Sequence, residues 1–267
     1  MAVLPTADNA LAASRTLPPP TPFGASSRLT VSVVIPAKNE AANLPWLLQR
    51  IPDSVDEVIL VDGLSADQTV AVGLMVRSDL VVVHEARPGK GVAVRSGFDV
   101  AKGDLIVMLD ADCSMDPAEI PRFVELLEQG YDMVKGSRFL AGGGTDDMTL
   151  LRKAGNWGLL RLANLLYRTG YSDLCYGFVG FRRELLDRVP LNASGFEVEM
   201  QLIARASRAG ARVGEVPSYE ARRLHGNSSL RTFPDGWRVL RTLLSELRFT
   251  GRGAPTTARS GDPHSSR

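Results

Sequence analysis

Two aspartates one residue apart, Asp110 and Asp112, carry the clearest chemical signal in the sequence. They follow the apolar run 105–109, which is typical of a strand buried on both faces of a parallel sheet. Carboxylates at such a place are the hard oxygen ligands that Mg²⁺ or Mn²⁺ prefers, and the cation keeps open positions for phosphate oxygens. The pattern predicts a site for a divalent cation and a diphosphate; the alternative is a pair of solvated loop aspartates.

A glycine-rich turn at 87–91, with the sequence Arg-Pro-Gly-Lys-Gly, is the second signal. Glycines let backbone N–H groups approach an anion, and the helix that should follow presents its positive end there. Lys90 would add a mobile cation, although an ordinary turn with a solvated lysine is the alternative. The turn is not a Walker A loop, because no Ser or Thr follows Gly-Lys, and it lacks the glycine set of a dinucleotide fingerprint.

Polar residues also follow two earlier apolar runs. Asp62 ends the run 57–62, where a carboxylate can accept a hydrogen bond from a base N–H or a ribose hydroxyl. Asn39 is placed to cap a helix, and Ser65-Ala66-Asp67-Gln68 has the form of a capping box.

Strands and helices are predicted to alternate around these residues. Strands are expected at 31–36, 57–62, 79–84, 105–110 and 133–136, and helices at 40–50, from about Ser65, at 91–101 and after Asp116-Pro117. Gly103 and Gly130 should end the last two helices, and Met115 should pack on Ile120 as a hydrophobic staple. This alternation predicts an open α/β sheet whose ligands lie beyond the carboxyl ends of its strands.

The amino-acid composition argues against several classes of protein. Lys and Arg number 31 and Asp and Glu 30 among 267 residues, so the net charge of +1 argues against nucleic-acid binding by bulk charge. Two cysteines and three histidines predict neither a disulfide framework nor a zinc or histidine-rich metal centre. The sequence shows no apolar run long enough to span a membrane and no secretory signal. We therefore expect a cytoplasmic protein, with peripheral contact at the inner face of the membrane as an option.

The chain ends differ from its middle. Residues 1–28 are rich in proline and predicted to be a disordered arm, and 250–267 are predicted to be a disordered tail. The folded domain is expected at 29–249.

The order of the motifs resembles that of the family 2 glycosyltransferases of the GT-A fold. From about Val31 to Leu244 the sequence reads P-A-x-N-E, V-D-x-x-S-x-D-x-T, G-K-G, D-A-D and G-S-R, which is most similar to the polyprenyl-phosphate, dolichol-phosphate mannosyltransferase-like branch. The resemblance implies a Rossmann-like, three-layer α/β/α fold with a mostly parallel central sheet. It also implies a nucleotide-sugar half at about 29–138 and an acceptor half at about 139–249. The implied reaction is metal-dependent, inverting transfer of a hexose from a UDP- or GDP-sugar to an acceptor, foremost a polyprenyl phosphate, with Mg²⁺ or Mn²⁺.

The resemblance also assigns residues. Those implied at the nucleotide sugar are Pro36, Ala37, Glu40, Asp62, Lys90, Gly91, Asp110, Ala111 and Asp112, with Asp110 and Asp112 on the metal. Those implied at the acceptor are Arg138, Arg223 and Ser228, and Arg138 and Asp112 are also implied in catalysis. Arg222 would join Arg223 and Ser228 as a clamp on an anionic acceptor. Glu199 resembles the general base of relatives with a hydroxyl acceptor; a first-turn helix residue is the alternative. A phosphate acceptor would need no base.

Three positions depart from the family pattern. Gly63 and Ser114 stand where relatives often carry a second Asp and a Gln or His, and Ser229 replaces the Lys of the R-x-x-G-x-S-K form. The last change weakens the case for a lipid-phosphate acceptor.

Two alternatives to the lipid acceptor therefore stay open. One is a soluble glycosyltransferase acting on a phosphorylated small acid or a natural product, since similar P-A-x-N-E and P-G-K-G elements occur in glucosyl-phosphoglycerate synthases. The other is an inactive scaffold that binds a nucleotide sugar.

The segment 234–249 is predicted to be an amphipathic helix with an apolar stripe at Trp237, Leu240, Leu244 and Leu247. It would either pack on the domain or dock on an anionic membrane. The sequence leaves the oligomeric state open.

Overall fold

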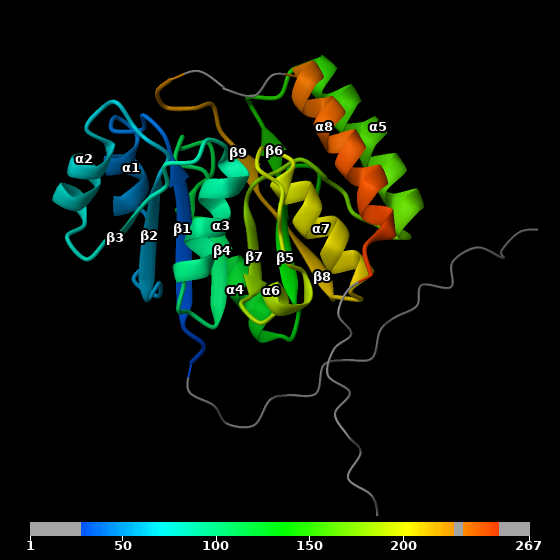
Figure 1. Cartoon of the computed structure of the whole chain (residues 1–267), viewed down its shortest axis with the longest axis horizontal. Helices are drawn as coiled ribbons and strands as arrows, with labels where there is room; N and C mark the ends of the chain where they lie inside the picture. The colour runs from blue at the N-terminus through cyan, green and yellow to red at the C-terminus, as the bar shows by residue number, and fades with distance from the viewer. Residues whose placement is uncertain (1–27, 227–231, 251–267) are drawn as a thin grey trace, which may run out of the picture.

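The computed structural model describes residues 28–226 and 232–250 (Figure 1). The predicted arm and tail lie outside these ranges, apart from Arg28 and Thr250. Ser228, predicted at the acceptor, also lies outside the described residues.

A seven-stranded sheet forms the centre of the molecule, in the order β3-β2-β1-β4-β7-β5-β8. Its strands are β1 (Val31–Ala37), β2 (Glu57–Asp62), β3 (Val81–His84), β4 (Leu105–Met108), β5 (Met133–Ser137), β7 (Val179–Arg182) and β8 (Val213–Pro217). Strand β7 is antiparallel to both of its neighbours, and all the other pairings are parallel. Two short strands, β6 (Gly144–Thr145) and β9 (Tyr219–Glu220), form a separate parallel pair.

Helices cover both faces of this sheet (Figure 1). One face carries α1 (Leu44–Gln49), α2 (Thr69–Val76), the 3₁₀ turn η1 (Pro117–Glu119) and α4 (Ile120–Glu128). The other carries α3 (Lys90–Val100), α6 (Leu185–Arg188) and α7 (Val198–Arg208). Helices α5 (Leu150–Tyr167) and α8 (Thr232–Ser245), the latter followed by η2 (Glu246–Arg248), lie side by side against α7 (Figure 1). The predicted three-layer α/β/α fold with a mostly parallel sheet is confirmed.

The strands bury both faces, as their continuous apolar runs predict. Val33 and Ile35 of β1 pack toward α1 and α4, whereas Val34 packs toward α3 and α7. All three side chains are fully buried. Because successive strand residues point to opposite faces, a strand between two helix layers needs apolar residues at every position.

Several predicted helix boundaries need correction. Helix α1 begins only at Leu44, and the closing glycine of α3 is not Gly103. The Gly103 N–H donates to Ser32 Oγ at 2.8 Å, and a Cβ there would lie 2.6 Å from the Ser32 nitrogen. Glycine is therefore required at this position for close packing on β1, not as a cap.

The start and end of α4 follow the prediction. Asp116 accepts a hydrogen bond from the Ala118 N–H at 3.0 Å, and Gly130 adopts a φ of 91° beyond the helix. The predicted helix at 234–249 corresponds to α8 and η2, but Val239 and Leu243 face the domain while Trp237 and Leu244 of the predicted stripe are exposed, so that stripe is not the one packed on the domain.

Candidate active site

The polar residues singled out in the sequence gather at one edge of the sheet. Strands β1, β2 and β4 are parallel, with Ala37 paired to Asp62 and Val34 paired to Met108, so their carboxyl ends lie together. The chain order 3-2-1-4 reverses between β1 and β4, which is where open α/β sheets bind their ligands. Asp110 and Asp112 follow β4 at this point.

Each of the three loops at this edge holds one residue in the left-handed backbone region. These residues are Asn39 after β1, Leu64 after β2 and Cys113 after β4, with φ between 58° and 62°. Such conformations cost free energy in non-glycine residues and cluster at binding and catalytic sites. The strain therefore marks this edge as a functional site independently of its carboxylates.

Hydrogen bonds tie the β1 and β2 loops together. Asn39 Oδ1 accepts from the Ala66 N–H at 2.7 Å, and Ser65 Oγ accepts from the Asn39 N–H at 2.9 Å. The predicted capping box is therefore wrong. Helix α2 starts at Thr69 without a side-chain cap, and Ser65 is used to brace the neighbouring loop.

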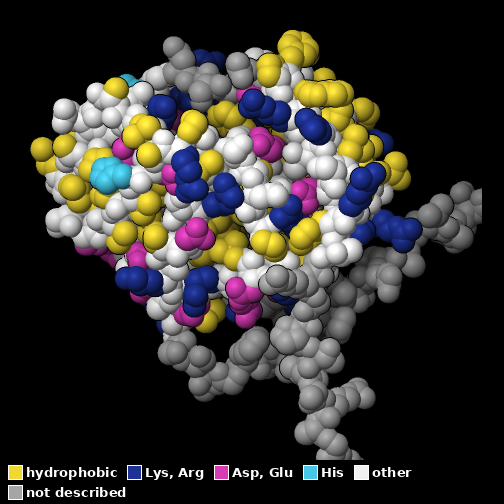
Figure 2. Space-filling model, in the orientation of Figure 1, with side chains coloured by type: hydrophobic (Ala, Val, Ile, Leu, Met, Phe, Trp, Pro, Cys, Tyr) yellow, Lys and Arg dark blue, Asp and Glu magenta, His cyan; other side chains and the backbone are white. Residues whose placement is uncertain are grey.

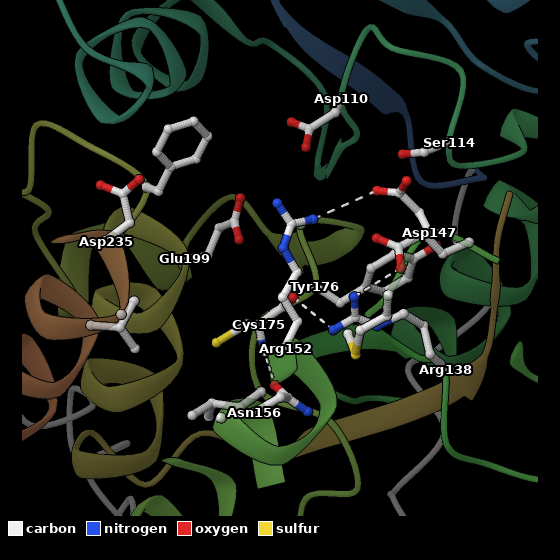
Figure 3. A pocket seen from close by; sticks show the side chains of 18 of the residues that line it. Asp110, Ser114, Arg138, Asp147, Arg152, Asn156, Cys175, Tyr176, Glu199 and Asp235 are labelled. Carbon is white, nitrogen blue, oxygen red and sulfur yellow. Dashed lines mark hydrogen bonds and ion pairs between the residues drawn. The ribbon is translucent and has the colours of Figure 1, made fainter. Parts of the chain in front are cut away.

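A largely buried charge cluster joins the predicted metal ligand Asp110 to the predicted base Glu199, both of which are labelled in Figure 3. Lys90 Nζ lies 2.6 Å from Asp110 Oδ1 and 2.6 Å from Glu199 Oε1. Beside them, Arg223 Nη2 lies 2.9 Å from Asp112 Oδ2, and the other oxygen of Asp112 accepts from the Ser114 N–H. The structure thus brings β4, α3, α7 and the segment after β9 together at one point.

Burial raises the pKa of Glu199, and the charge of Asp110 adds to this effect against the attraction of Lys90. Burial alone would lower the pKa of Lys90, but the attraction of Asp110 and Glu199 outweighs it, so the pKa of the ammonium is raised. The lysine therefore stays charged between two carboxylates, and Glu199 is a better proton acceptor than an exposed glutamate.

The predicted anion cradle at Gly91 is not found. The Gly91 N–H donates to the carbonyl of Ser194 at 3.0 Å, and a Cβ at Gly91 would lie 2.5 Å from the Ala193 carbonyl oxygen. The glycine lets α3 pack closely on the segment before α7, and its N–H is not available to a phosphate. The Lys90 side chain, 12% exposed, is correspondingly held in ion pairs instead of being mobile.

Arg138 is also placed differently from the expectation of a free arginine facing phosphates. Its guanidinium donates to both carboxylate oxygens of Asp173, to Glu220 and to the Cys175 carbonyl at 2.7 to 3.0 Å. Its side chain is 4% exposed and that of Asp173 is fully buried. Four hydrogen bonds use most of the five guanidinium donors, so Arg138 chiefly fixes the wall of the site.

A cavity of about 210 Å³ opens beside this cluster, bounded by α5, α7, α8 and the β4 loop (Figure 3). Six carboxylate residues and four cationic residues line it: Asp110, Asp112, Asp147, Glu199, Glu220 and Asp235, with Lys90, Arg138, Arg152 and Arg223. Apolar side chains complete the lining, among them Met148, Leu151, Leu159, Met200 and Val239. The cavity therefore offers an acidic region that attracts cations and an apolar wall.

Sequence reasoning missed the contribution of α5. Arg152 and Asn156 line the cavity from this helix. Arg152 is paired only loosely with Asp147, at 3.8 Å, and Asn156 hydrogen-bonds Asp173 and the Cys175 N–H. The i, i+4, i+7 spacing of Arg152, Asn156 and Leu159 would have indicated that one face of α5 points into the site.

Other predicted site residues lie around the cavity instead of in its lining. Pro36, Ala37 and Asp62 are at the ends of β1 and β2, and Asp62 accepts from the Ser65 N–H at 3.2 Å. Burial raises the pKa of Glu40, which the nearby charges of Asp112 and Asp110 raise further against a hydrogen bond from Asn43. Arg222 is exposed and outside the cavity lining.

Asp110 and Asp112 fit a divalent cation by their chemistry, since both present hard oxygen ligands at one loop. Within residues 28–226 and 232–250, no group of three or more His, Cys, Asp or Glu side chains is arranged to hold a metal. Two protein carboxylates match a cation that takes its remaining ligands from a bound diphosphate and water.

The fold and this site define an α/β protein with a carboxylate-rich cavity at the carboxyl edge of its sheet, and comparison with known proteins identifies the family. The family model described as glycosyl transferase family 2 matches residues 32–189. The dolichol-phosphate mannosyltransferase of Pyrococcus furiosus is 31% identical over 212 residues, which is 76% of this chain and 60% of that protein. The low-salt glycan biosynthesis hexosyltransferase Agl6 of Haloferax volcanii is 30% identical over 80% of this chain and 53% of its own length.

Comparison with solved structures also finds a glycosyltransferase. Glucosyl-3-phosphoglycerate synthase from Mycobacterium tuberculosis, in complex with Mn²⁺, UDP and phosphoglyceric acid, matches with a TM-score of 0.66 and 28% identity over 82% of this chain and 79% of that one.

The chain belongs to glycosyl transferase family 2. The predicted family, its GT-A fold and its likeness to the dolichol-phosphate mannosyltransferase branch are confirmed. The chain spans between about half and three-fifths of the length of these two curated relatives. None of the helices in the described part of the chain is long and apolar enough to cross a membrane.

Proposed function

We propose that this protein transfers a hexose from a UDP- or GDP-sugar to a polyprenyl phosphate, assisted by Mg²⁺ or Mn²⁺. The observation that carries the proposal is the cavity next to Asp110 and Asp112, which combines the cations of Arg152 and Arg223 with an apolar wall. The arginines suit the phosphate head of an acceptor and the apolar wall suits its chain, whereas a small phosphorylated acid would use the arginines alone.

The donor would lie across the ends of β1, β2 and β4. Asp62 and Glu40 would contact the ribose and base, and Asp110 and Asp112 would hold the cation with the diphosphate. The cation, when bound, supplies Lewis-acid stabilisation of the departing diphosphate. Because six carboxylates outweigh four cations in the cavity, a diphosphate should bind poorly without it.

The acceptor phosphate would meet cations that are close to the reacting centre. Arg223 is held at Asp112, and Arg152 reaches into the cavity from α5 with only a loose ion pair. Arginine binds phosphate in a bidentate geometry, so Arg152 is the residue that we place at the acceptor phosphate. Arg138 acts through its neighbours: it holds Asp173 and Glu220, which shape the wall beside Arg152.

A water-soluble acceptor is the second candidate. The likeness to glucosyl-3-phosphoglycerate synthase favours it, because that enzyme was solved with phosphoglyceric acid. Glu199, buried and hydrogen-bonded to Lys90, would then serve as the general base for an acceptor hydroxyl.

Calorimetric titration of UDP and GDP, with and without Mn²⁺, tests the donor site. We expect one nucleotide to bind in a Mn²⁺-dependent manner and Asp112→Asn to abolish that dependence. Asp79→Asn is the matched control, because the Asp79 side chain is 67% exposed and far from this edge. Failure of both nucleotides to bind in the presence of Mn²⁺ would refute the donor site and, with it, the proposed transfer.

Transfer of radiolabelled sugar to a short-chain polyprenyl phosphate in detergent, compared with phosphoglyceric acid, then tests the acceptor. Turnover with the small acid alone would overturn the lipid assignment and favour the soluble enzyme.

A further inference from the structure

Helix α5 exposes an unusual number of large apolar side chains for the surface of a globular domain. Leu150 is 84% exposed, Trp157 59% and Leu165 76%. They lie on one stripe of the helix with Arg161 and Arg168, at intervals of three, four or seven residues. Arg161 stacks over the Trp157 ring at 4.7 Å, so aromatic and basic groups are interleaved on this stripe.

Helix α8 repeats the pattern. Phe233 is 76% exposed, Trp237 68% and Leu244 49%. Arg241 and Arg248 occupy the same stripe at intervals of three and four residues. The two helices lie side by side, and Figure 2 shows hydrophobic and basic side chains together over the region that they occupy. We call these exposed apolar residues and the cations among them the α5–α8 patch.

The exposed charge of this patch has one sign. Helix α5 contains no acidic residue at all. The two acidic residues of α8 and η2, Asp235 and Glu246, are 3% and 6% exposed, and they pair with Arg238 and Arg205. The exposed cations are Lys153, Arg161, Arg168, Arg238, Arg241 and Arg248.

The patch adjoins the acceptor side of the active site. Both helices contribute to the cavity lining, through Gly155 on α5 and Gly236 on α8. Leu151 belongs to the lining and is also 57% exposed. A surface that covers the patch would therefore lie at the mouth of the cavity.

We infer that the α5–α8 patch docks on an anionic membrane surface. Tryptophan and arginine together favour the interface between lipid headgroups and acyl chains, where aromatic rings insert and cations meet anionic lipids. A face-to-face contact with a second copy would instead oppose two sets of like charges, which is unfavourable. Delivery of a lipid phosphate to the cavity, which docking would serve, rests on the proposed function. The docking itself is inferred from the exposed side chains alone.

Co-sedimentation of the full chain with vesicles tests the inference. We expect binding to phosphatidylglycerol-rich vesicles that weakens as salt is raised, and weak or no binding to phosphatidylcholine vesicles. Arg161→Gln with Arg241→Gln should weaken binding by about fivefold for each arginine removed. Trp157→Ser with Trp237→Ser should weaken it by about tenfold.

Matched controls come from exposed positions outside the α5–α8 patch. Met75 on α2 is 84% exposed and Lys102 is exposed after α3, so Met75→Ser and Lys102→Gln should leave vesicle binding unchanged. Thermal unfolding of every variant checks that the fold is kept. None of the four patch residues lines the cavity, so transfer to a short-chain acceptor in detergent should also be unchanged.

Absence of binding to phosphatidylglycerol-rich vesicles at low salt would overturn the inference. So would patch variants that bind as well as the unsubstituted protein. A dimer in light scattering that becomes a monomer on substitution of the two tryptophans would assign the patch to a second copy. Vesicles without any acceptor lipid report docking alone, and the detergent assay reports transfer alone. Failure of the docking inference is therefore distinguishable from failure of the proposed function.

Discussion

Replacement of Glu199 by glutamine separates the two candidate acceptors. A phosphate acceptor is already an anion, and its attack on the sugar needs no proton removal. A hydroxyl acceptor needs a general base, and Glu199 is the buried carboxylate beside the predicted metal ligand Asp110. The proposed function therefore predicts that Glu199→Gln retains most of its activity with a polyprenyl phosphate.

The structure sets the size of the expected effect. Glutamine keeps an oxygen that can accept from Lys90, and Lys90 keeps its second partner, Asp110 Oδ1, at 2.6 Å. The cluster loses one negative charge but no buried cation is left unpaired. We expect a fall in kcat of less than about tenfold, equivalent to about 1.4 kcal/mol. Loss of a true general base costs about 10²- to 10⁴-fold.

Initial rates with saturating donor and Mn²⁺, measured for Glu199→Gln and the unsubstituted protein, give the comparison. Asp110→Asn is the matched control, because it removes the other partner of the same lysine and should lose far more activity through the cation. A fall of 10²-fold or more in kcat for Glu199→Gln, with KM unchanged, would refute the phosphate-acceptor reasoning. It would identify Glu199 as the base of an enzyme that uses a hydroxyl acceptor.

Four further results are expected. Asp173→Asn should lower the free energy of unfolding by about 3–5 kcal/mol, because it deprives the buried Arg138 guanidinium of its main partner; urea titration measures this, and a loss below about 1 kcal/mol would contradict it. Burial raises the pKa of Asp173, but the hydrogen bonds and charge of Arg138 outweigh it and hold that pKa low. Its contribution is therefore present above about pH 4 and is lost as the pH falls through the lowered pKa, so the stability deficit of Asp173→Asn should shrink in acid. Gly177→Ala should weaken Mn²⁺-dependent nucleotide binding in calorimetry, because the new Cβ would lie 2.8 Å from Glu199 Oε1; Gly158→Ala, with nothing within 4 Å, should bind normally. Arg152→Gln should raise KM for a phosphate acceptor at least about tenfold and leave donor binding unchanged; an unchanged KM would remove Arg152 from the acceptor site.

The local sequence determined where the strands form and at which edge of the sheet the candidate site residues lie. The run that becomes β4 is apolar at every position because the strand lies between two helix layers, and the polar residues begin where it ends. Because parallel strands bring their carboxyl ends to one edge, the sequence alone predicts that Asp62, Asp110 and Asp112 lie at the same edge of the sheet. The ordered motifs were also sufficient to identify the family.

Tertiary structure decided which charges face one another. Lys90 and Glu199 are 109 residues apart, and nothing local reveals that the lysine is held between two carboxylates. Arg138 looked like a free phosphate ligand because its partners, Asp173 and Glu220, are distant in sequence. The outward face of α8 depends on which of its stripes α5 and α7 leave uncovered. Sequence periodicity reports the types of residue on each side of a helix or strand, whereas ion pairs, burial and exposed faces depend on how the elements pack.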